Sequence, residues 1–243
     1  MVDGNTRICG LIGDPVSHTL SPLIHNTVSK QFGHNNLYVP FQVKKWELQQ
    51  TVRGAYALNI LGLNITFPYK NQVISSLVEI DDITSKIGAV NTLVRCHGGY
   101  KGYNTDMLGL FKALSSDEIV IEDNDVIILG AARAAAFMCA LNKAKSVYLL
   151  NRTFEKSKII ANEVNNFFNR EYIFPIKLSD YSKLPNKKFL AIQATNVGLY
   201  PDINQLVIDD KAFYEKIHTG YDLIYKPRNT LFMQNVKKNG GKA

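Results

Sequence analysis

The first part of the chain alternates short apolar runs with stretches of helical spacing. The apolar runs at residues 7–12, 37–43 and 60–65 are typical of strands. Between them, residues 22–33 and 45–58 place apolar side chains at helical intervals. Strands that alternate with helices are typical of parallel sheets. This part is therefore predicted to form an α/β domain with a mostly parallel sheet.

The alternation resumes after a polar, acidic segment at residues 115–124. A buried strand at 126–129, a turn at Gly130, an Ala-rich helix at 134–141 and a strand at 147–150 then follow. Strand, glycine turn, helix and strand together form the dinucleotide-binding unit of a Rossmann-type domain. Further strand–helix units, a late strand and a C-terminal helix are expected at residues 153–169, 172–178, 189–195, 221–225 and 230–238.

The polar segment is interpreted as a domain boundary. We expect one α/β domain at residues 1–115 and a second, Rossmann-type domain at residues 116–243. Ligands of such sheets bind at the C-terminal ends of the strands, so the loops that follow the strands are where functional residues are expected.

The composition is that of a globular, cytoplasmic protein. Hydrophobic residues make up 46% and charged residues 20% of the chain, and no apolar run approaches the length of a membrane span. The N-terminus lacks the pattern of a secretory signal. Cys9, Cys96 and Cys139 have neither metal-site nor disulfide spacing and are interpreted as reduced, mostly buried thiols. The net charge of +7 is spread along the chain, which favours small anionic substrates over nucleic acid.

Asn64, Thr66 and Lys70 follow the third predicted strand. Threonine is a good helix cap and proline fits a first turn, so Thr66 and Pro68 predict a helix that starts directly after the strand. A lysine at this edge of the sheet can meet a small polar or anionic molecule and exchange a proton with it. The alternative is a turn with a solvated lysine.

A loop rich in hydroxyl groups follows the first strand, at residues 13–22. Thr19 and Ser21 are spaced to point the same way, and the loop is expected to face the same pocket as Lys70. Two hydroxyls and a lysine suit a ligand with carboxylate and hydroxyl groups. The alternative is that Ser21 only caps a helix begun by Pro22 and that Thr19 only packs.

Asp106 lies in the first turn, or at the cap, of a predicted helix that runs through Leu114. Capping alone is the alternative role for this carboxylate. Upstream of it, residues 88–92 open a short strand, and Gly98 with Gly99 predicts a hairpin turn.

Asn151 and Arg152 bear on the choice of dinucleotide. Asn151 lies 21 residues past Gly130, where NAD-dependent enzymes place a carboxylate on the ribose. An arginine instead attracts a 2′-phosphate and can bind it with two hydrogen bonds, so the pair favours NADP over NAD. The glycine signal is weak by itself, because only one glycine remains of the usual three.

Six short motifs occur in order along the chain: GDPVSHTLSPLIHN, NITFPYK, GAVNT, GYNTD, NRT and DLIYKP. In this order they resemble the shikimate dehydrogenase family, including its quinate-using relatives. The resemblance covers nearly the whole chain, from about Arg7 to about Gly240. It implies a substrate-binding and catalytic domain at residues 1–115 and an NADP-binding domain at residues 116–243, both α/β, with the active site in the cleft between them.

The resemblance also implies a reaction, the reversible NADPH-dependent reduction of 3-dehydroshikimate to shikimate in aromatic amino acid biosynthesis. NADP is then the cofactor, and the expected assembly is a monomer or homodimer. Lys70 matches the catalytic lysine and Asp106 its aspartate partner. The matching substrate contacts are Thr19, Ser21, Asn64, Thr66 and Asn91. The matching cofactor contacts are Gly130, Ala131, Arg133, Asn151, Arg152 and Thr153.

Several differences from the family pattern bear on function. Thr19 replaces the usual serine, and Gln193 stands where the family usually has asparagine. The turn at residues 130–133 lacks three residues, including two glycines that let the backbone approach a pyrophosphate, so weakened NADP binding is expected. The chain ends before a segment that in the family supplies a substrate-contacting glutamine, so exposed apolar surface is expected on the first domain.

An NADP-dependent shikimate dehydrogenase is therefore the favoured function. A catalytically impaired homologue that at most binds shikimate-like acids is one alternative. A quinate/shikimate dehydrogenase is the other, because it shares the chemistry and differs only in substrate.

Overall fold

The computed structural model describes residues 2–243, which fold into two compact units. The first unit ends at Asp106, and the second extends from Met107 to Ala243. This division falls at the first residue of helix α4 (Asp106–Ser116), earlier than the polar segment. The separate roles expected for residues 1–115 and 116–243 stay a prediction.

The first unit is built on a six-stranded mixed sheet with the strand order β2-β1-β3-β5-β6-β4. β1 is parallel to β2 and β3, and β4 is parallel to β6, whereas β5 is antiparallel to β3 and β6. The predicted strands and the hairpin turn between β5 and β6 are confirmed. The strand bounds are β1 (Arg7–Gly13), β2 (Asn36–Gln42), β3 (Gly62–Ile65), β4 (Glu79–Ile80), β5 (Thr92–Cys96) and β6 (Gly99–Tyr103).

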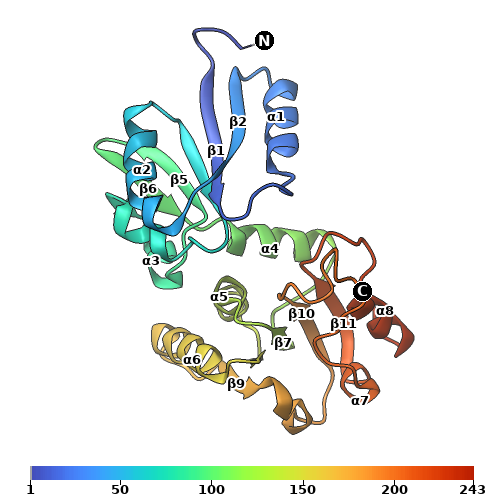
Figure 1. Cartoon of the computed structure of the whole chain (residues 1–243). Coiled ribbons are helices and arrows are strands. Elements are labelled where there is room, and N and C mark those ends of the chain that lie inside the picture. The colour runs from blue at the N-terminus through green and yellow to red at the C-terminus, as the bar shows by residue number, and fades with distance from the viewer. Residues whose placement is uncertain (1) are drawn as a thin grey trace. The chain divides into compact units, whose positions relative to one another are not determined.

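Helices α1 and α2 lie on opposite sides of this sheet (Figure 1). Leu48, Val52 and Ala55 of α2 are buried, as the helical spacing predicted. Ile12 and Ile65 are paired across β1 and β3 and are 0% and 2% exposed, so the core lies directly beneath the ends of these two strands. The helical segments are α1 (Ser21–Gln31), η1 (Lys45–Glu47), α2 (Leu48–Ala57), η2 (Gln72–Ser76) and α3 (Asp82–Ile87).

The helix predicted to start at Pro68 does not form, and the chain turns instead until η2 begins. The Tyr69 N–H donates to Thr66 O at 2.9 Å and closes this turn. The Tyr69 side chain is 1% exposed, and its hydroxyl donates to Val43 O at 2.6 Å. Burial of Tyr69 therefore overrides the helix-start signal, and Lys70 lies in a tight turn.

The alternative role of Ser21 as a helix cap is not observed, because α1 begins at Ser21 itself and Leu20 is the N-cap. The Ser21 N–H donates to Thr19 Oγ1 at 3.2 Å. The Thr19 hydroxyl thus satisfies one of the donors that a helix start leaves without a partner. Pro22 lies in the first turn, as predicted.

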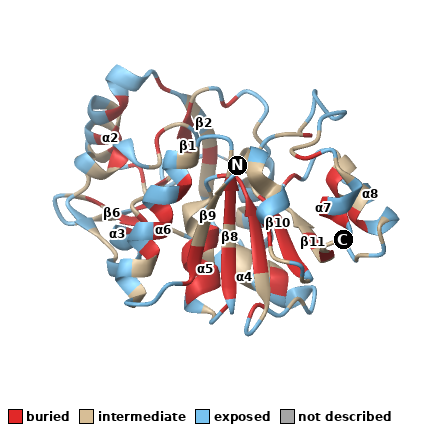
Figure 2. Ribbon diagram, turned by 90° about the horizontal axis from the view of Figure 1, so that it is seen from below, coloured by how far each residue is buried: buried red, intermediate tan, exposed pale blue. Residues whose placement is uncertain are grey.

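The second unit contains a five-stranded parallel sheet with the order β11-β10-β7-β8-β9, which is a Rossmann-type arrangement. Figure 2 shows the central strands of this sheet as buried over most of their length. The strands are β7 (Asp125–Leu129), β8 (Ser146–Asn151), β9 (Ile173–Lys177), β10 (Phe189–Gln193) and β11 (Ile217–Asp222). The helical segments after α4 are α5 (Arg133–Leu141), α6 (Phe154–Phe168), η3 (Leu178–Lys183), α7 (Lys211–Tyr214) and α8 (Leu231–Lys238).

The late strand lies earlier than predicted, because β11 covers residues 217–222 and not 221–225. Ile217 is 1% exposed, whereas Leu223 and Tyr225 are 43% and 62% exposed. The Asp222 side chain accepts a hydrogen bond from the Ile224 N–H at 2.9 Å, so the chain turns there. Leu223 and Tyr225 therefore lie in an exposed loop, although Ile224 between them is buried.

Helix α1 has no buried residue. Apolar side chains that are 45% to 68% exposed lie along it and at its ends: Leu20, Leu23, Ile24, Val28 and Phe32. Helix α1 therefore carries an exposed apolar surface. Within residues 2–243, no helix is long and apolar enough to cross a bilayer. The three cysteines are free, and of these only Cys139 is buried.

A partly buried polar cluster stabilises the second sheet. Asp125, at the start of β7, accepts hydrogen bonds from Lys187 Nζ at 2.7 Å and from Ser146 Oγ of β8. Burial alone would raise the pKa of the Asp125 carboxyl. The hydrogen bonds from Lys187 and Ser146 outweigh burial, so the pKa lies below its ordinary value of 3.8. The folded protein therefore stabilises the charged form of the Asp125 side chain.

Asp125→Asn is expected to lower the free energy of unfolding by about 1–2 kcal/mol at pH 7, because the amide lacks the charge that holds Lys187. A lowered folded-state pKa gives stability that is present above the ordinary value of 3.8 and is lost as the pH falls through the folded-state value. The difference in free energy of unfolding between the unchanged protein and Asp125→Asn should therefore shrink below about pH 4. Urea unfolding at neutral and acidic pH measures it.

Glu215→Gln is the control for this substitution, because it breaks only an exposed ion pair with Lys211. Its stability should equal that of the unchanged protein. If Asp125→Asn lowered the free energy of unfolding by the same amount at both pH values, the charge argument would be wrong.

Candidate functional site

The sheet of the first unit brings together the two loops that were expected to share a pocket. β1 and β3 are parallel neighbours, so the loops after them leave from the same edge. The Thr66 N–H donates to Ile12 O at 2.9 Å, and the Asp14 N–H donates to Phe67 O at 3.1 Å. The hydroxyl-rich loop and the turn that carries Lys70 are thus joined by backbone hydrogen bonds.

Lys70 and Asp106 form an ion pair at this edge. Lys70 Nζ donates to Asp106 Oδ2 at 2.6 Å, and the two side chains are 36% and 41% exposed. The other carboxylate oxygen, Asp106 Oδ1, accepts from Asn91 Nδ2 at 2.6 Å. Asp106 is also the first residue of α4, so both sequence-based interpretations of its place are compatible with the structure. The lysine is held and is not freely solvated.

Asn91 is the buried centre of this group, with 9% of its surface exposed. Its Nδ2 also donates to Thr105 Oγ1 at 2.9 Å, and its Oδ1 accepts from the Thr105 N–H at 2.9 Å. The Val90 N–H donates to Lys70 O at 2.7 Å and fixes the backbone of the lysine. Both amide protons of Asn91 are thus used within the protein, so Asn91 orients Asp106.

Asn64 of β3 lies between two further residues of the same sheet. Its Nδ2 donates to Thr92 Oγ1 at 3.2 Å, and its Oδ1 accepts from the Tyr38 hydroxyl at 2.8 Å. Thr92 Oγ1 donates to Asn91 Oδ1 at 3.0 Å, which connects the two predicted asparagines. Tyr38 was not among the predicted residues, because it lies in the middle of β2 and belongs to none of the motifs.

The hydroxyl groups of the first loop also meet. Thr19 Oγ1 donates to Ser21 Oγ at 3.1 Å, as their spacing predicted. The Thr66 side chain is half-buried in the neighbouring turn, and within residues 2–243 its hydroxyl has no hydrogen-bond partner. Three hydroxyls, two amides and one ammonium group are therefore positioned by neighbouring loops. Such a set can bind a polyhydroxylated acid and give a proton to it.

In the second unit, Gly130 makes the turn from β7 to α5 possible. Its φ is +107°, and an added Cβ would lie 2.9 Å from Thr195 Cγ2 and 3.1 Å from Ala194 O. Ala131 and Ala132 have no positive φ, so the shortened turn accommodates both alanines without strain. The N-terminus of α5 has no side-chain cap and offers its first backbone N–H groups to an anion.

Some of the residues predicted to contact the cofactor phosphates already have partners within the protein, and others do not. Arg133 forms an ion pair with Glu163 of α6, and Asn151 Nδ2 donates to Thr153 O at 2.8 Å. Arg152 is exposed and has no ion pair within the part of the chain that the structure describes. Thr153 is the N-cap residue of α6 and is exposed.

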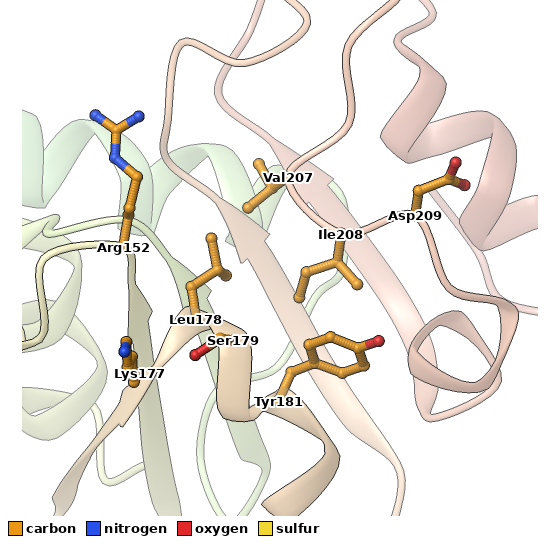
Figure 3. A pocket seen from close by; sticks show the side chains of 8 residues that line it. All are labelled: Arg152, Lys177, Leu178, Ser179, Tyr181, Val207, Ile208 and Asp209. Atoms are coloured by element: carbon orange, nitrogen blue, oxygen red, sulfur yellow. The ribbon is translucent and has the colours of Figure 1, made fainter.

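Arg152 lines a cavity of about 370 Å³ in this unit. Lys177 also lines it, because β8 and β9 are paired and place Lys177 opposite Asn151. Figure 3 shows Arg152 and Lys177 on one side of the cavity and Asp209 on the other. Lys177 was not predicted, since no motif contains it and only the pairing of β8 with β9 brings it to this place.

Gln193, which replaces the family's usual asparagine, is 1% exposed. Its Oε1 accepts from the N–H and the hydroxyl of Thr195, both at 2.8 Å, and its Nε2 donates to Val197 O at 3.1 Å. Gln193 thus shapes the loop after β10, the same loop that packs against Gly130.

Sequence comparison decides the family. The family described as shikimate dehydrogenase substrate binding domain matches residues 11–93. A shikimate dehydrogenase (NADP(+)) from Caldanaerobacter subterraneus subsp. tengcongensis is 35% identical over 245 residues, which cover 100% of this chain and 86% of the relative. The chain belongs to the shikimate dehydrogenase family. The resemblance carried by the six motifs is thereby confirmed.

Solved structures of the family have the same fold. The crystal structure of a shikimate dehydrogenase in complex with NADP+ matches with a TM-score of 0.90 and 34% identity, over 100% of this chain and 85% of that one. A shikimate 5-dehydrogenase from Listeria monocytogenes, in complex with shikimate and NAD, matches with a TM-score of 0.91 and 26% identity. That match covers 99% of this chain and 86% of the Listeria chain.

Proposed function

We propose that this chain is an NADP-dependent oxidoreductase that reversibly reduces 3-dehydroshikimate to shikimate. The observation that carries the proposal is the ion pair between Lys70 Nζ and Asp106 Oδ2, at 2.6 Å, in a chain of the shikimate dehydrogenase family. The pair lies among amides and hydroxyls that suit a polyhydroxylated acid. In the biosynthesis of aromatic amino acids, this reaction belongs to the shikimate pathway.

Lys70 is the proposed acid/base residue. When the substrate ketone is reduced, negative charge develops on its oxygen, and an ammonium group can stabilise that oxygen and donate a proton to it. Asp106 holds the ammonium in place, so the lysine is oriented before the substrate arrives. In the reverse direction, Lys70 accepts the proton of the alcohol.

The remaining residues of the first unit are proposed to bind the substrate. Thr19 and Ser21 are proposed to donate hydrogen bonds to its carboxylate, for which the Thr19 hydroxyl turns from Ser21 to the ligand. Thr66 has a hydroxyl without a partner and is a further donor or acceptor. Asn64 is proposed to contact a ring hydroxyl, while Asn91 acts mainly by fixing Asp106.

The residues of the second unit fit an NADP molecule. The uncapped N-terminus of α5, approached through Gly130 and Ala131, offers backbone N–H groups to the pyrophosphate. Arg152 is proposed to bind the 2′-phosphate beside Asn151 and Thr153, because its guanidinium has no partner in the described chain. Arg133 would have to leave Glu163 before it could bind a phosphate. When bound, NADPH supplies the hydride.

The cofactor site is proposed to be weaker than the family pattern suggests. Fewer backbone N–H groups surround the pyrophosphate when the turn is short. We place the enzyme in the cytoplasm, supported by its free cysteines. A monomeric or homodimeric assembly stays a prediction.

Lys70→Ala is expected to lower kcat by about 10²–10⁴-fold, because the proton donor is removed while the substrate contacts remain. The measurement is NADP-dependent oxidation of shikimate, followed by absorbance. Lys101→Ala is the matched control, since Lys101 also pairs with a carboxylate, Glu79, but outside the site. A Lys70→Ala variant that keeps most of the rate would overturn the proposed mechanism.

Arg152→Ala is expected to raise the KM for NADP by about 10–100-fold, because one charge-assisted contact with the 2′-phosphate is lost. The KM for NAD should change little, since NAD lacks that phosphate. Lys158→Ala, which removes an exposed cation of α6 that does not line the cavity, is the control. Equal use of NAD and NADP by the unchanged protein would argue against the role of Arg152.

A further inference from the structure

Tyr38 of β2 is a buried side chain that reaches the proposed substrate site. It is 4% exposed and packs with Leu11 and Val16. Its ring also stacks on His25 of α1, with the ring centroids 4.1 Å apart and the planes inclined by 5°. The ring is therefore held from two sides, and its hydroxyl occupies a defined place.

The hydroxyl of Tyr38 determines how the Asn64 amide is oriented. It donates to Asn64 Oδ1 at 2.8 Å, while Asn64 Nδ2 faces Asn91 O and Thr92 Oγ1 at 3.2 Å each. A main-chain carbonyl only accepts hydrogen bonds, so the amide atom that faces Asn91 O must be the nitrogen. The oxygen therefore faces Tyr38, and Tyr38 must be the donor.

This orientation limits what Asn64 can offer to a ligand. Both of its N–H groups are used within the protein, whereas Oδ1 keeps a free lone pair beside the bond from Tyr38. Asn64 can therefore accept a hydrogen bond from a ligand but cannot donate one. An acceptor selects a hydroxyl of the ligand over a carboxylate.

Tyr38 keeps the proton that this orientation requires. Burial raises the pKa of the Tyr38 hydroxyl, so the group stays protonated and donates its single proton to Asn64. β2 and β3 are thus joined through one buried hydroxyl.

We propose that Tyr38 is a positioning residue for the substrate, holding Asn64 Oδ1 as the acceptor for a ring hydroxyl of a polyhydroxylated acid. This inference rests on the proposed function and adds a residue that the motifs do not include. It concerns binding of the substrate and not the chemical step, because Lys70 and Asp106 are held by other partners.

Tyr38→Phe tests the proposal, because it removes only the hydroxyl and keeps the ring. The KM for shikimate should rise by about 10-fold, which is the effect of one lost hydrogen bond. The kcat should stay within about twofold, and the KM for NADP should not change. A purely structural role would instead change all three values.

Tyr100→Phe is the matched control. Tyr100 is 1% exposed, and its hydroxyl donates to Ile60 O at 2.8 Å, before β3 begins and away from Asn64. This variant should leave both KM values and kcat unchanged. If it raised the KM for shikimate as much as Tyr38→Phe does, the effect would be general to buried tyrosines and the proposal would be wrong.

A double-mutant cycle shows whether Tyr38 acts through Asn64. In an Asn64→Ala background, Tyr38→Phe should change kcat/KM for shikimate by less than about twofold, against about 10-fold in the unchanged protein. Equal effects in both backgrounds would overturn the proposal. Failure of the proposed function is distinguished beforehand, because the unchanged protein would then neither oxidise nor bind shikimate.

Discussion

The ion pair between Lys70 and Asp106 is the interaction on which the proposed site depends. A lysine side chain is flexible, and its charge is useful for catalysis only where a partner holds it. Asp106 is such a partner because Asn91 binds its second oxygen, and Asn91 is itself fixed by Thr105. The orientation of one ammonium group thus depends on a buried amide that need not touch the substrate.

The fold provides this arrangement through the order of its strands. Because β1 and β3 are parallel neighbours, the loop with Thr19 and the turn with Lys70 leave the sheet side by side. Ile12 and Ile65 are buried directly beneath them, so polar loops rest on a packed apolar layer. Tyr38 combines both features, because its ring is buried in the apolar layer while its hydroxyl contacts the polar Asn64.

The apolar pattern predicted most strands and helices, because alternating burial leaves a strong periodic signal. It failed where one tertiary contact outweighed local propensity. The buried Tyr69 side chain replaces the helix expected at Pro68 by a turn, and the turn at Asp222 ends the last strand early. Motifs located the predicted site residues, but Tyr38 lies in none of them. It reaches the site only through the pairing of β2 with β1, which no local pattern reveals.

The central claim is that the first unit is a preformed site for shikimate in a chain that also binds NADP. Titration of the purified chain with each compound separately, by calorimetry, tests it most directly. We expect shikimate to bind one molecule per chain, and NADP to bind as well but weakly, because the turn at Gly130 is short. A folded chain that binds neither compound would contradict the account and leave the family assignment as a statement of ancestry alone.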